Sequence, residues 1–375
     1  MGKNTQCVHS GTAPDRVTRG LNTPVYTSSS FEYLDAPENV YPRYYNTPNQ
    51  HAVVKKLSAL ENTESGLLFS SGMAAISTVI FSMAGQGDHV IMQRDIYGGT
   101  HHFVTAEFER FGIEFTFVSN QVEDFERAIK SNTHLIYIET PSNPLLVITD
   151  IEAISNLAKS KNLVTAIDNT FASPINQNPH DLGIDIVIHS GTKYLGGHSD
   201  LCCGAVLSTH KLIDRIKAAA ANFGGSMNAT TCHILERSLK TLGIRVEKQN
   251  QNALALAKYL DDHQWVEKVY YPGLATHPGF DIATKQMCGF GGMLSFELDE
   301  ARIHPDLFVR RLNLITPALS LGGVETIICA PAVTSHAKID AEERKALGIA
   351  DGLFRLSVGI EDVDDLIADI GSALV

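Results

Sequence analysis

Lys193 lies in the segment SGTKYLGGHSD (190–200), among small and hydroxylated residues. A lysine amine can form a Schiff base with an aldehyde once it has lost its proton, and burial or a nearby cation lowers its pKa. The hydroxyls of Ser190 and Thr192 beside it can donate hydrogen bonds to a phosphate. A solvated surface charge is the alternative interpretation for a lysine in a loop.

Two earlier segments place polar side chains directly after apolar runs of strand length. DNTFASP begins with Asp168, a carboxylate that could pair with a protonated ring nitrogen or could cap the next element. ETPSNP holds Asn143 in a rigid loop bounded by prolines, for which a simple turn is the alternative. The small residues of SSGMAA (70–75) would let phosphate oxygens approach a helix N-terminus, although any tight turn before a helix favours such residues.

Two further residues fit the same chemistry. Tyr97 in DIYGGTHHF could stack on a pyridine ring or pack in a core, and Arg355 in LFRLSVGIED could clamp a carboxylate or form a structural ion pair. A phosphate cup, a partner for a ring nitrogen and an imine-forming amine are what pyridoxal 5'-phosphate (PLP) requires of a protein. The residues therefore predict PLP as cofactor and an amino acid as substrate.

The elements that must position these residues are apolar strands separated by helices. Six strand-length runs stand out: 89–93, 114–118, 134–140, 163–169, 185–190 and 204–208. Strands that are apolar on both faces and alternate with helices predict a mostly parallel sheet with helices on its faces, and ligands gather at the carboxyl ends of such strands. A long helical section is expected over 229–262, broken at Gly243, before a smaller α+β domain. We expect an N-terminal arm (1–50), a large domain (51–235) and a C-terminal domain (236–375).

Composition excludes several classes of function. The formal net charge of −12 argues against nucleic acid or an anionic membrane as partner. The sequence after Met1 has no apolar signal core, so a cytoplasmic location is expected. The cysteines have no zinc-binding spacing, the histidines form no HExxH pattern, and no metal is predicted. No G-x-G-x-x-G follows the first strand, which disfavours a dinucleotide oxidoreductase.

Nine segments spread along the chain carry a further signal: TPVYTSSSF, YPRYYNTP, SSGMAA, IYGGT, ETPSNP, DNTFASP, SGTKYLGGHSD, SLGGVET and LFRLSVGIED. Because of these segments, nearly the whole chain resembles the Cys/Met-metabolism family of PLP enzymes. The resemblance implies PLP-dependent transferase fold type I, the aspartate aminotransferase-like α/β fold. It implies that Lys193 holds the cofactor and moves protons at the substrate Cα, that Asp168 keeps the pyridine nitrogen protonated, and that Tyr97 stacks on the ring and aids proton transfer. It assigns phosphate binding to Gly72, Met73, Ser190 and Thr192.

The resemblance also implies a substrate clamp and a subunit arrangement. Arg355 would bind the substrate carboxylate with Ser320 nearby, and Asn143 would contact the ring hydroxyl or that carboxylate. Tyr41 and Arg43 would reach the phosphate in a neighbouring subunit, and the expected assembly is a homotetramer of such dimers.

The sequence departs from the family pattern at positions that bear on substrate choice. Leu319 stands where cystathionine γ-lyases have a Glu expected to pair with the distal ammonium of cystathionine. His102 stands where many γ-lyases and γ-synthases have Arg, and Gly99 where methionine γ-lyases have Cys. Residues 46–48 read Asn-Thr-Pro where many members have Asn-Pro-Thr.

We therefore expect a carbon–sulfur lyase of trans-sulfuration and methionine metabolism, with cystathionine β-lyase activity favoured. Cystathionine γ-lyase, methionine γ-lyase, and γ-replacement by a cystathionine γ-synthase or homoserine-ester sulfhydrylase are the alternatives. A non-catalytic PLP binder is disfavoured, because Lys193, Tyr97 and Arg355 are all present.

Overall fold

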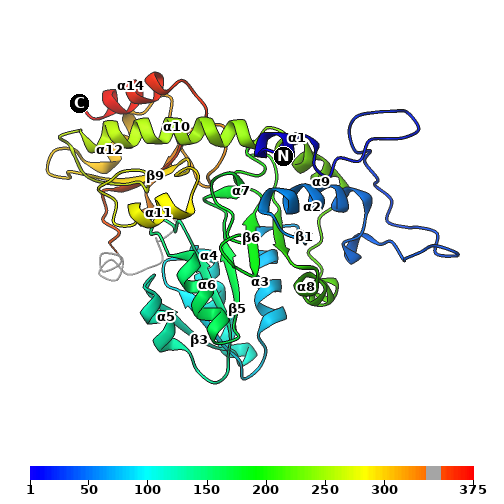
Figure 1. Ribbon diagram of the computed structural model, residues 1–375. Coiled ribbons are helices and arrows are strands. Elements are labelled where there is room, and N and C mark those ends of the chain that lie inside the picture. Colours follow the sequence, from blue (N-terminus) through cyan, green and yellow to red (C-terminus); the bar gives the residue numbers. More distant parts are fainter. Residues whose placement is uncertain (335–347) are drawn as a thin grey trace.

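The computed structural model describes residues 1–334 and 348–375 and is built around two sheets (Figure 1). The larger sheet has seven strands, in the spatial order β1 (Ser65–Phe69), β7 (Gly204–Ser208), β6 (Ile186–Ser190), β5 (Val164–Asp168), β4 (Thr133–Glu139), β2 (His89–Gln93) and β3 (Glu114–Val118). β6, β5, β4, β2 and β3 pair in parallel, and β7 runs antiparallel to both of its neighbours. The predicted mostly parallel α/β sheet is confirmed.

Both faces of the larger sheet are buried, which explains why its strands are continuously apolar. Along β4, Leu135 and Tyr137 enter one core cluster, whereas Ile136 and Ile138 enter the other. One face is covered by α3 (Gly72–Met83), α4 (Gly98–Phe111) and α8 (His210–Phe223). The other is covered by α2 (Pro48–Glu61), α5 (Val122–Ala128), α6 (Ile151–Ser160), α7 (Ser173–Asn176) and α9 (Ala229–Leu239).

The C-terminal part forms the smaller, five-stranded sheet and its own apolar core. Its strands lie in the order β10 (Thr316–Pro317), β11 (Ile327–Cys329), β12 (Leu353–Ser357), β9 (Met293–Leu298) and β8 (Val266–Tyr270). Its helices are α11 (Phe280–Gln286), α12 (Pro305–Arg311), α14 (Val363–Ala373) and the short 3₁₀ turn η2 (Pro331–Val333). The long helix α10 (Leu242–Asp261) packs on β8, β9 and α14, and it runs across the top of the molecule toward α1 (Figure 1).

The long helical section differs from expectation in where it breaks. α9 ends at Leu239 and α10 begins at Leu242, so the interruption falls before Gly243, which is itself helical. A Cβ at Gly243 would lie 1.8 Å from Asn4 Oδ1. The glycine therefore permits the close approach of α1 to α10 and does not end a helix.

The first 50 residues, expected to form an N-terminal arm, contain both helical and irregular parts. α1 (Lys3–His9) packs on α2 and α10, with Cys7 buried among their side chains, and η1 (Pro42–Tyr44) precedes α2. Between them, residues 11–41 have no regular structure and extend away from the body (Figure 1). Among the described residues, no helix is long and apolar enough to cross a membrane.

Candidate active site

A cavity of about 470 Å³ is lined by residues from the carboxyl edge of the larger sheet and from the C-terminal part of the chain. The carboxyl ends of parallel strands meet at one edge of a sheet, which brings together residues far apart in sequence. Eleven of the residues to which the sequence assigns a role in the site line this cavity: Gly72, Met73, Tyr97, Asn143, Asp168, Ser190, Thr192, Lys193, Leu319, Ser320 and Arg355.

Lys193 is placed by a tight turn that follows β6. The N–H of Gly196 donates to the Gly191 carbonyl (2.8 Å) and that of Gly197 to the Lys193 carbonyl (2.7 Å). The Lys193 Nζ donates to the Ser320 Oγ at 2.5 Å. Burial, and then the positive charge of Arg355, lower the pKa of the Lys193 amine, which favours the neutral, nucleophilic form.

Asp168 is the last residue of β5 and is almost fully buried. Its Oδ1 accepts hydrogen bonds from the Thr170 hydroxyl (2.5 Å) and backbone N–H (3.0 Å). The same hydroxyl accepts from the Ser190 N–H (2.8 Å), so the ends of β5 and β6 are tied together. Burial raises the pKa of Asp168 although the bonds from Thr170 oppose it, and a cationic partner in the cavity would satisfy this carboxylate.

The first turn of α3 forms one end of the cavity. Ser71 caps the helix by accepting from the Ala74 N–H at 3.1 Å. A Cβ at Gly72 would lie 2.9 Å from the Ser190 Cβ, so only glycine allows the helix start to lie so close to β6. The helix N-terminus together with the Ser190 and Thr192 hydroxyls could hold an anion such as a phosphate.

Arg355 lies on β12 and is 6% exposed. Its Nη1 donates to Asn143 Oδ1 (2.7 Å) and its Nη2 to the Ser320 carbonyl (3.0 Å). Its buried Nε has no hydrogen-bond partner among the described residues. A guanidinium that is fixed by two hydrogen bonds and keeps an unpaired N–H donor can bind a carboxylate ligand.

Tyr97 directly precedes α4, and its backbone N–H donates to the Glu139 Oε2 at 2.7 Å. The side chain is about half exposed in the cavity. A Cβ at Gly99 would lie 2.4 Å from the Tyr97 Cε1, so any side chain at position 99 would displace the ring. Gly99 is thus part of the wall that sets the Tyr97 conformation.

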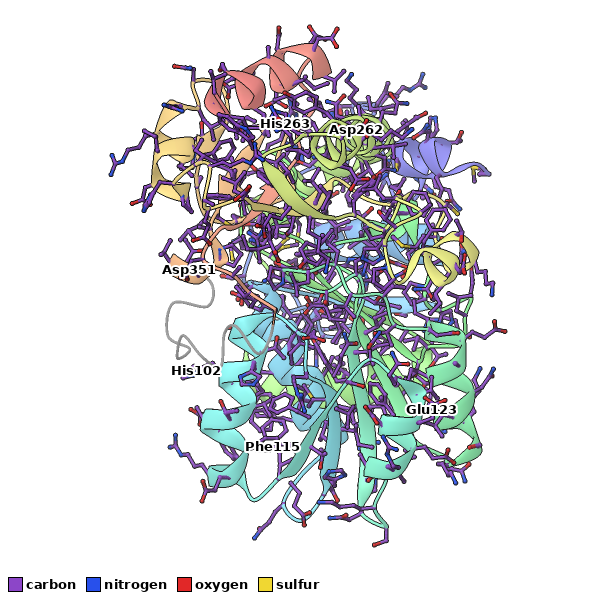
Figure 2. All side chains as sticks on the ribbon, turned by 90° about the vertical axis from the view of Figure 1, so that its left-hand side faces the viewer. His102, Phe115, Glu123, Asp262, His263 and Asp351 are labelled. Atoms are coloured by element: carbon purple, nitrogen blue, oxygen red, sulfur yellow. The ribbon has the colours of Figure 1, made fainter. Side chains whose placement is uncertain are left out.

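Three of the singled-out residues do not line the cavity. Tyr41 and Arg43 lie at η1, where Arg43 donates to the Ala221 carbonyl and packs over the Tyr41 ring. His102 lies on α4, on the same side of the molecule as Asp351 in Figure 2.

Several cavity residues were not identified from the sequence, among them Glu139, Thr170, Cys202, Cys329 and Thr334. Glu139 ends β4 directly opposite Asp168 on β5, so the strand-end argument applied to Asp168 would also have found it. Cys329 and Thr334 carry no such signal, because they reach the cavity only through the packing of the C-terminal part of the chain on the larger sheet. Cys202 lies in the loop between β6 and β7, close to Lys193 in sequence.

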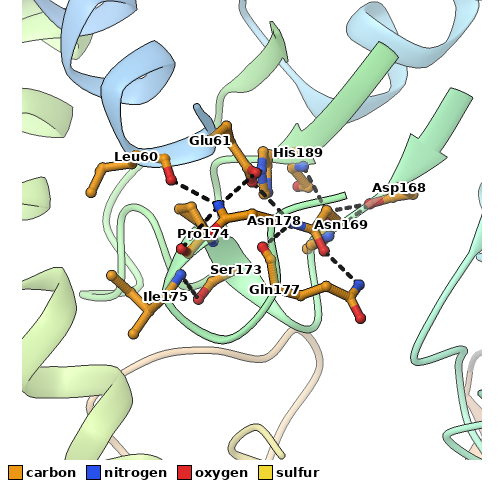
Figure 3. Close-up of polar contacts among 12 residues, drawn as sticks. Leu60, Glu61, Asp168, Asn169, Ser173, Pro174, Ile175, Gln177, Asn178 and His189 are labelled. Atoms are coloured by element: carbon orange, nitrogen blue, oxygen red, sulfur yellow. Dashed lines mark hydrogen bonds and ion pairs between the residues drawn. The ribbon is translucent and has the colours of Figure 1, made fainter. Parts of the chain in front are cut away.

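A buried polar network lies behind the ends of β5 and β6 (Figure 3). Glu61 Oε1 is 2.6 Å from His189 Nε2 and accepts from the Asn169 amide at 2.9 Å. Its Oε2 accepts from the Asn178 amide at 3.2 Å. Asn169 and Gln177 are also joined at 3.0 Å. Because Asn169 follows Asp168 and His189 precedes Ser190, this network fixes the backbone on which the cavity residues stand.

The set of groups fits PLP: a cradle for the phosphate at α3, a buried carboxylate for the ring nitrogen, an amine of lowered pKa and a buried guanidinium for an amino acid. The arrangement has the groups needed to bind an amino acid and to move a proton at its Cα.

Comparison with known proteins agrees with this interpretation. The family model described as Cys/Met metabolism PLP-dependent enzyme matches residues 4–375. Cystathionine gamma-lyase of Bacillus subtilis (strain 168) is 44% identical, covering 100% of this chain and 99% of that protein. Cystathionine beta-lyase of Lactococcus lactis subsp. lactis (strain IL1403) is 42% identical, covering 99% and 98%.

Among solved structures, cystathionine gamma-lyase from Lactobacillus plantarum complexed with L-serine superposes with a TM-score of 0.95 at 42% identity, covering 100% of this chain and 98% of that one. The resemblance expected from the motifs is confirmed, and with it PLP as cofactor and fold type I. The chain belongs to the Cys/Met-metabolism family of PLP-dependent enzymes.

Proposed function

We propose that the protein is a cystathionine β-lyase, which converts cystathionine to homocysteine, pyruvate and ammonia. The observation that carries the choice of reaction is Leu319. It lines the cavity and is 71% exposed, so an apolar side chain stands where a γ-lyase would offer a carboxylate to the distal ammonium of cystathionine. β-Elimination needs only one proton removal, at Cα, before sulfur leaves.

The residues of the cavity divide this work. Arg355 would bind the substrate α-carboxylate and orient it, and Lys193 would take the Cα proton through its Nζ. PLP, when bound, supplies an electron sink for the negative charge left at Cα. Asp168 would hold a proton on the ring nitrogen, Tyr97 would cover the ring, and Ser320, 2.5 Å from the Lys193 Nζ, would orient that amine.

A second candidate is γ-elimination, because both a γ-lyase and a β-lyase stand among relatives that are more than 40% identical along the whole chain. γ-Elimination requires a further proton removal at Cβ, for which Lys193 and Tyr97 would both have to reach the substrate.

Incubation with cystathionine and identification of the keto acid distinguishes the reactions. Pyruvate with homocysteine is expected, and 2-oxobutyrate without pyruvate would contradict β-elimination. A product that forms only when an activated homoserine ester and a thiol are both present would instead indicate γ-replacement.

We further propose that Tyr41 and Arg43 complete the site of a second copy of this chain within a homotetramer. The segment that leads to them exposes apolar side chains, among them Val17, Leu21 and Leu34, which a second copy would cover. Arg43→Ala should weaken cofactor binding about 10- to 100-fold, the value of a charged hydrogen bond to phosphate, without changing the mass measured by light scattering. Unchanged cofactor affinity would contradict this role.

A further inference from the structure

Glu139 is a buried carboxyl in the wall of the cavity to which no role has yet been given. It ends β4 and pairs in register with Asp168 at the end of β5. Among the described residues, no ion pair joins Glu139 to a lysine, arginine or histidine. Burial, and then the negative charge of Asp168, raise the pKa of Glu139 well above its ordinary value. Burying a carboxyl without a cationic partner is energetically unfavourable, so we expect Glu139 to have a role that compensates for its burial.

The carboxyl joins two loops that leave different strands. It accepts from the backbone N–H of Tyr97, which follows β2, at 2.7 Å. The backbone N–H of Asn143, which follows β4, also faces the carboxyl and lowers its pKa. A carboxylate presents acceptors on both oxygens to these converging N–H groups, whereas an amide has one acceptor oxygen and an NH2 group that would face a donor.

The backbone of Glu139 is held equally firmly. The Gln93 side chain donates to the Glu139 carbonyl (2.9 Å) and accepts from its N–H (3.3 Å). Gln93 is fully buried and is the last residue of β2. The carboxyl therefore projects from a fixed point between the two strand ends.

The contacts of Asn143 extend this connection around the cavity. The Asn143 Oδ1 accepts from the Arg355 Nη1 (2.7 Å), and the Arg355 Nη2 donates to the Ser320 carbonyl (3.0 Å). The Ser320 Oγ in turn accepts from the Lys193 Nζ (2.5 Å). Hydrogen bonds thus link the Asn143 side chain to the Arg355 clamp and, through Ser320, to Lys193, while the Asn143 backbone faces Glu139.

We propose that Glu139 is a positioning residue whose carboxyl fixes Tyr97 relative to Asn143, and through Asn143 keeps the Arg355 clamp in register with the cofactor ring. This rests on the proposed roles of Tyr97 and Asn143, but not on which bond of the substrate is cleaved. Glu139 acts through these residues and takes no proton itself.

The test compares Glu139→Gln and Glu139→Ala holoenzymes with a matched control, Asp369→Asn. Asp369 is also a buried carboxyl that accepts backbone N–H bonds, from Asn313, Leu314 and Ile315, but it lies in the C-terminal domain away from the cavity. Glu139→Gln should lower kcat about 10-fold and Glu139→Ala about 100-fold, because small misplacements in a site are costly, with a smaller rise in KM. Asp369→Asn should leave both constants within two-fold.

The visible circular dichroism of the bound cofactor is the second readout, because it reports ring orientation and needs no substrate. Both Glu139 variants should change it and Asp369→Asn should not, even if the enzyme proves to act on an amino acid other than cystathionine. A folded Glu139→Ala enzyme with kcat, KM and dichroism within two-fold of the unmutated enzyme would overturn the proposal.

Amide hydrogen exchange of the unmutated holoenzyme tests the same contact if the variants do not fold. The Tyr97 and Asn143 amides should exchange at least 10-fold more slowly than the amide of Gly98, one of the donors left without an intrahelical partner at the start of α4. Exchange of all three at one rate would also overturn the proposal.

Discussion

The two walls of the cavity are built differently. The wall from the larger sheet carries Asp168, Ser190 and Lys193, and behind it lies the network of Glu61 and His189, in which the carboxylate accepts from several side chains (Figure 3). The wall from the C-terminal part of the chain carries Leu319, which is largely exposed, and Arg355, which is buried.

This difference indicates that the sheet wall serves the reaction and that the other wall serves the selection of the substrate. Groups that meet the cofactor must stay in one geometry, and a buried, fully bonded network gives that rigidity at the strand ends. Groups that meet the variable end of a substrate stand on an exposed segment, where a substitution costs little stability. We therefore expect changes in the sheet wall to abolish turnover or folding, and changes in the other wall to redirect specificity.

The largest effect is expected for Lys193→Ala. Loss of the amine removes both the covalent attachment and the base at Cα, so kcat should fall by about 10³-fold or more. Mass spectrometry after borohydride reduction should show cofactor mass on the unmutated chain and none on the variant. Lys130→Ala, which removes an exposed lysine paired with Glu114, is the control and should retain both properties. A variant that keeps the covalent mass would refute the assignment of Lys193.

Glu61→Gln should disrupt the hydrogen-bond network behind the sheet wall without changing any residue that lines the cavity. The Glu61 carboxylate accepts from His189, Asn169 and Asn178, and an amide would place a donor against donors. We expect the free energy of unfolding in urea to fall by about 3 kcal/mol, as for other broken buried pairs. Glu114→Gln, at an exposed ion pair, should leave the free energy of unfolding nearly unchanged. Equal losses in the two variants would show that the network adds no rigidity.

The sheet wall is also the part of the site that the sequence predicts well. Asp168 and Lys193 follow apolar strands directly, so residue type and strand end together locate them. Glu139 and Thr170 lie in the same motifs, but their roles depend on which way a side chain points after the strand ends. The partners of Arg355, and the approach of Cys329 to the cavity, depend on the packing of the C-terminal part of the chain on the larger sheet, which no local pattern encodes. Gly243 predicts the helix break at the wrong position for the same reason, since this glycine makes room for the distant Asn4 and does not end a helix.

Arg355→Lys should weaken substrate binding while leaving the sheet wall intact. Lysine keeps the charge but loses the planar fork that contacts Asn143 and Ser320 and would meet the substrate carboxylate. KM should rise about 10- to 50-fold, corresponding to one or two charged hydrogen bonds, with kcat reduced less. Arg110→Lys, at an exposed pair on α4, should leave KM unchanged. A fall confined to kcat would mean that Arg355 does not bind the carboxylate.

The smallest effect is expected for Leu319→Glu, which tests whether the exposed wall selects the substrate. A carboxylate here could pair with the distal ammonium of cystathionine, but at a position 71% exposed the pair is screened by water. We therefore expect kcat/KM for cystathionine to rise only about two- to five-fold relative to methionine, which has no distal ammonium. The gain should shrink as salt is raised, because screening weakens exposed pairs.

Leu319→Gln has nearly the same shape without the charge and should show no gain. If the two variants behave alike at low salt, charge at position 319 does not select the substrate, and Leu319 no longer supports the proposed β-elimination.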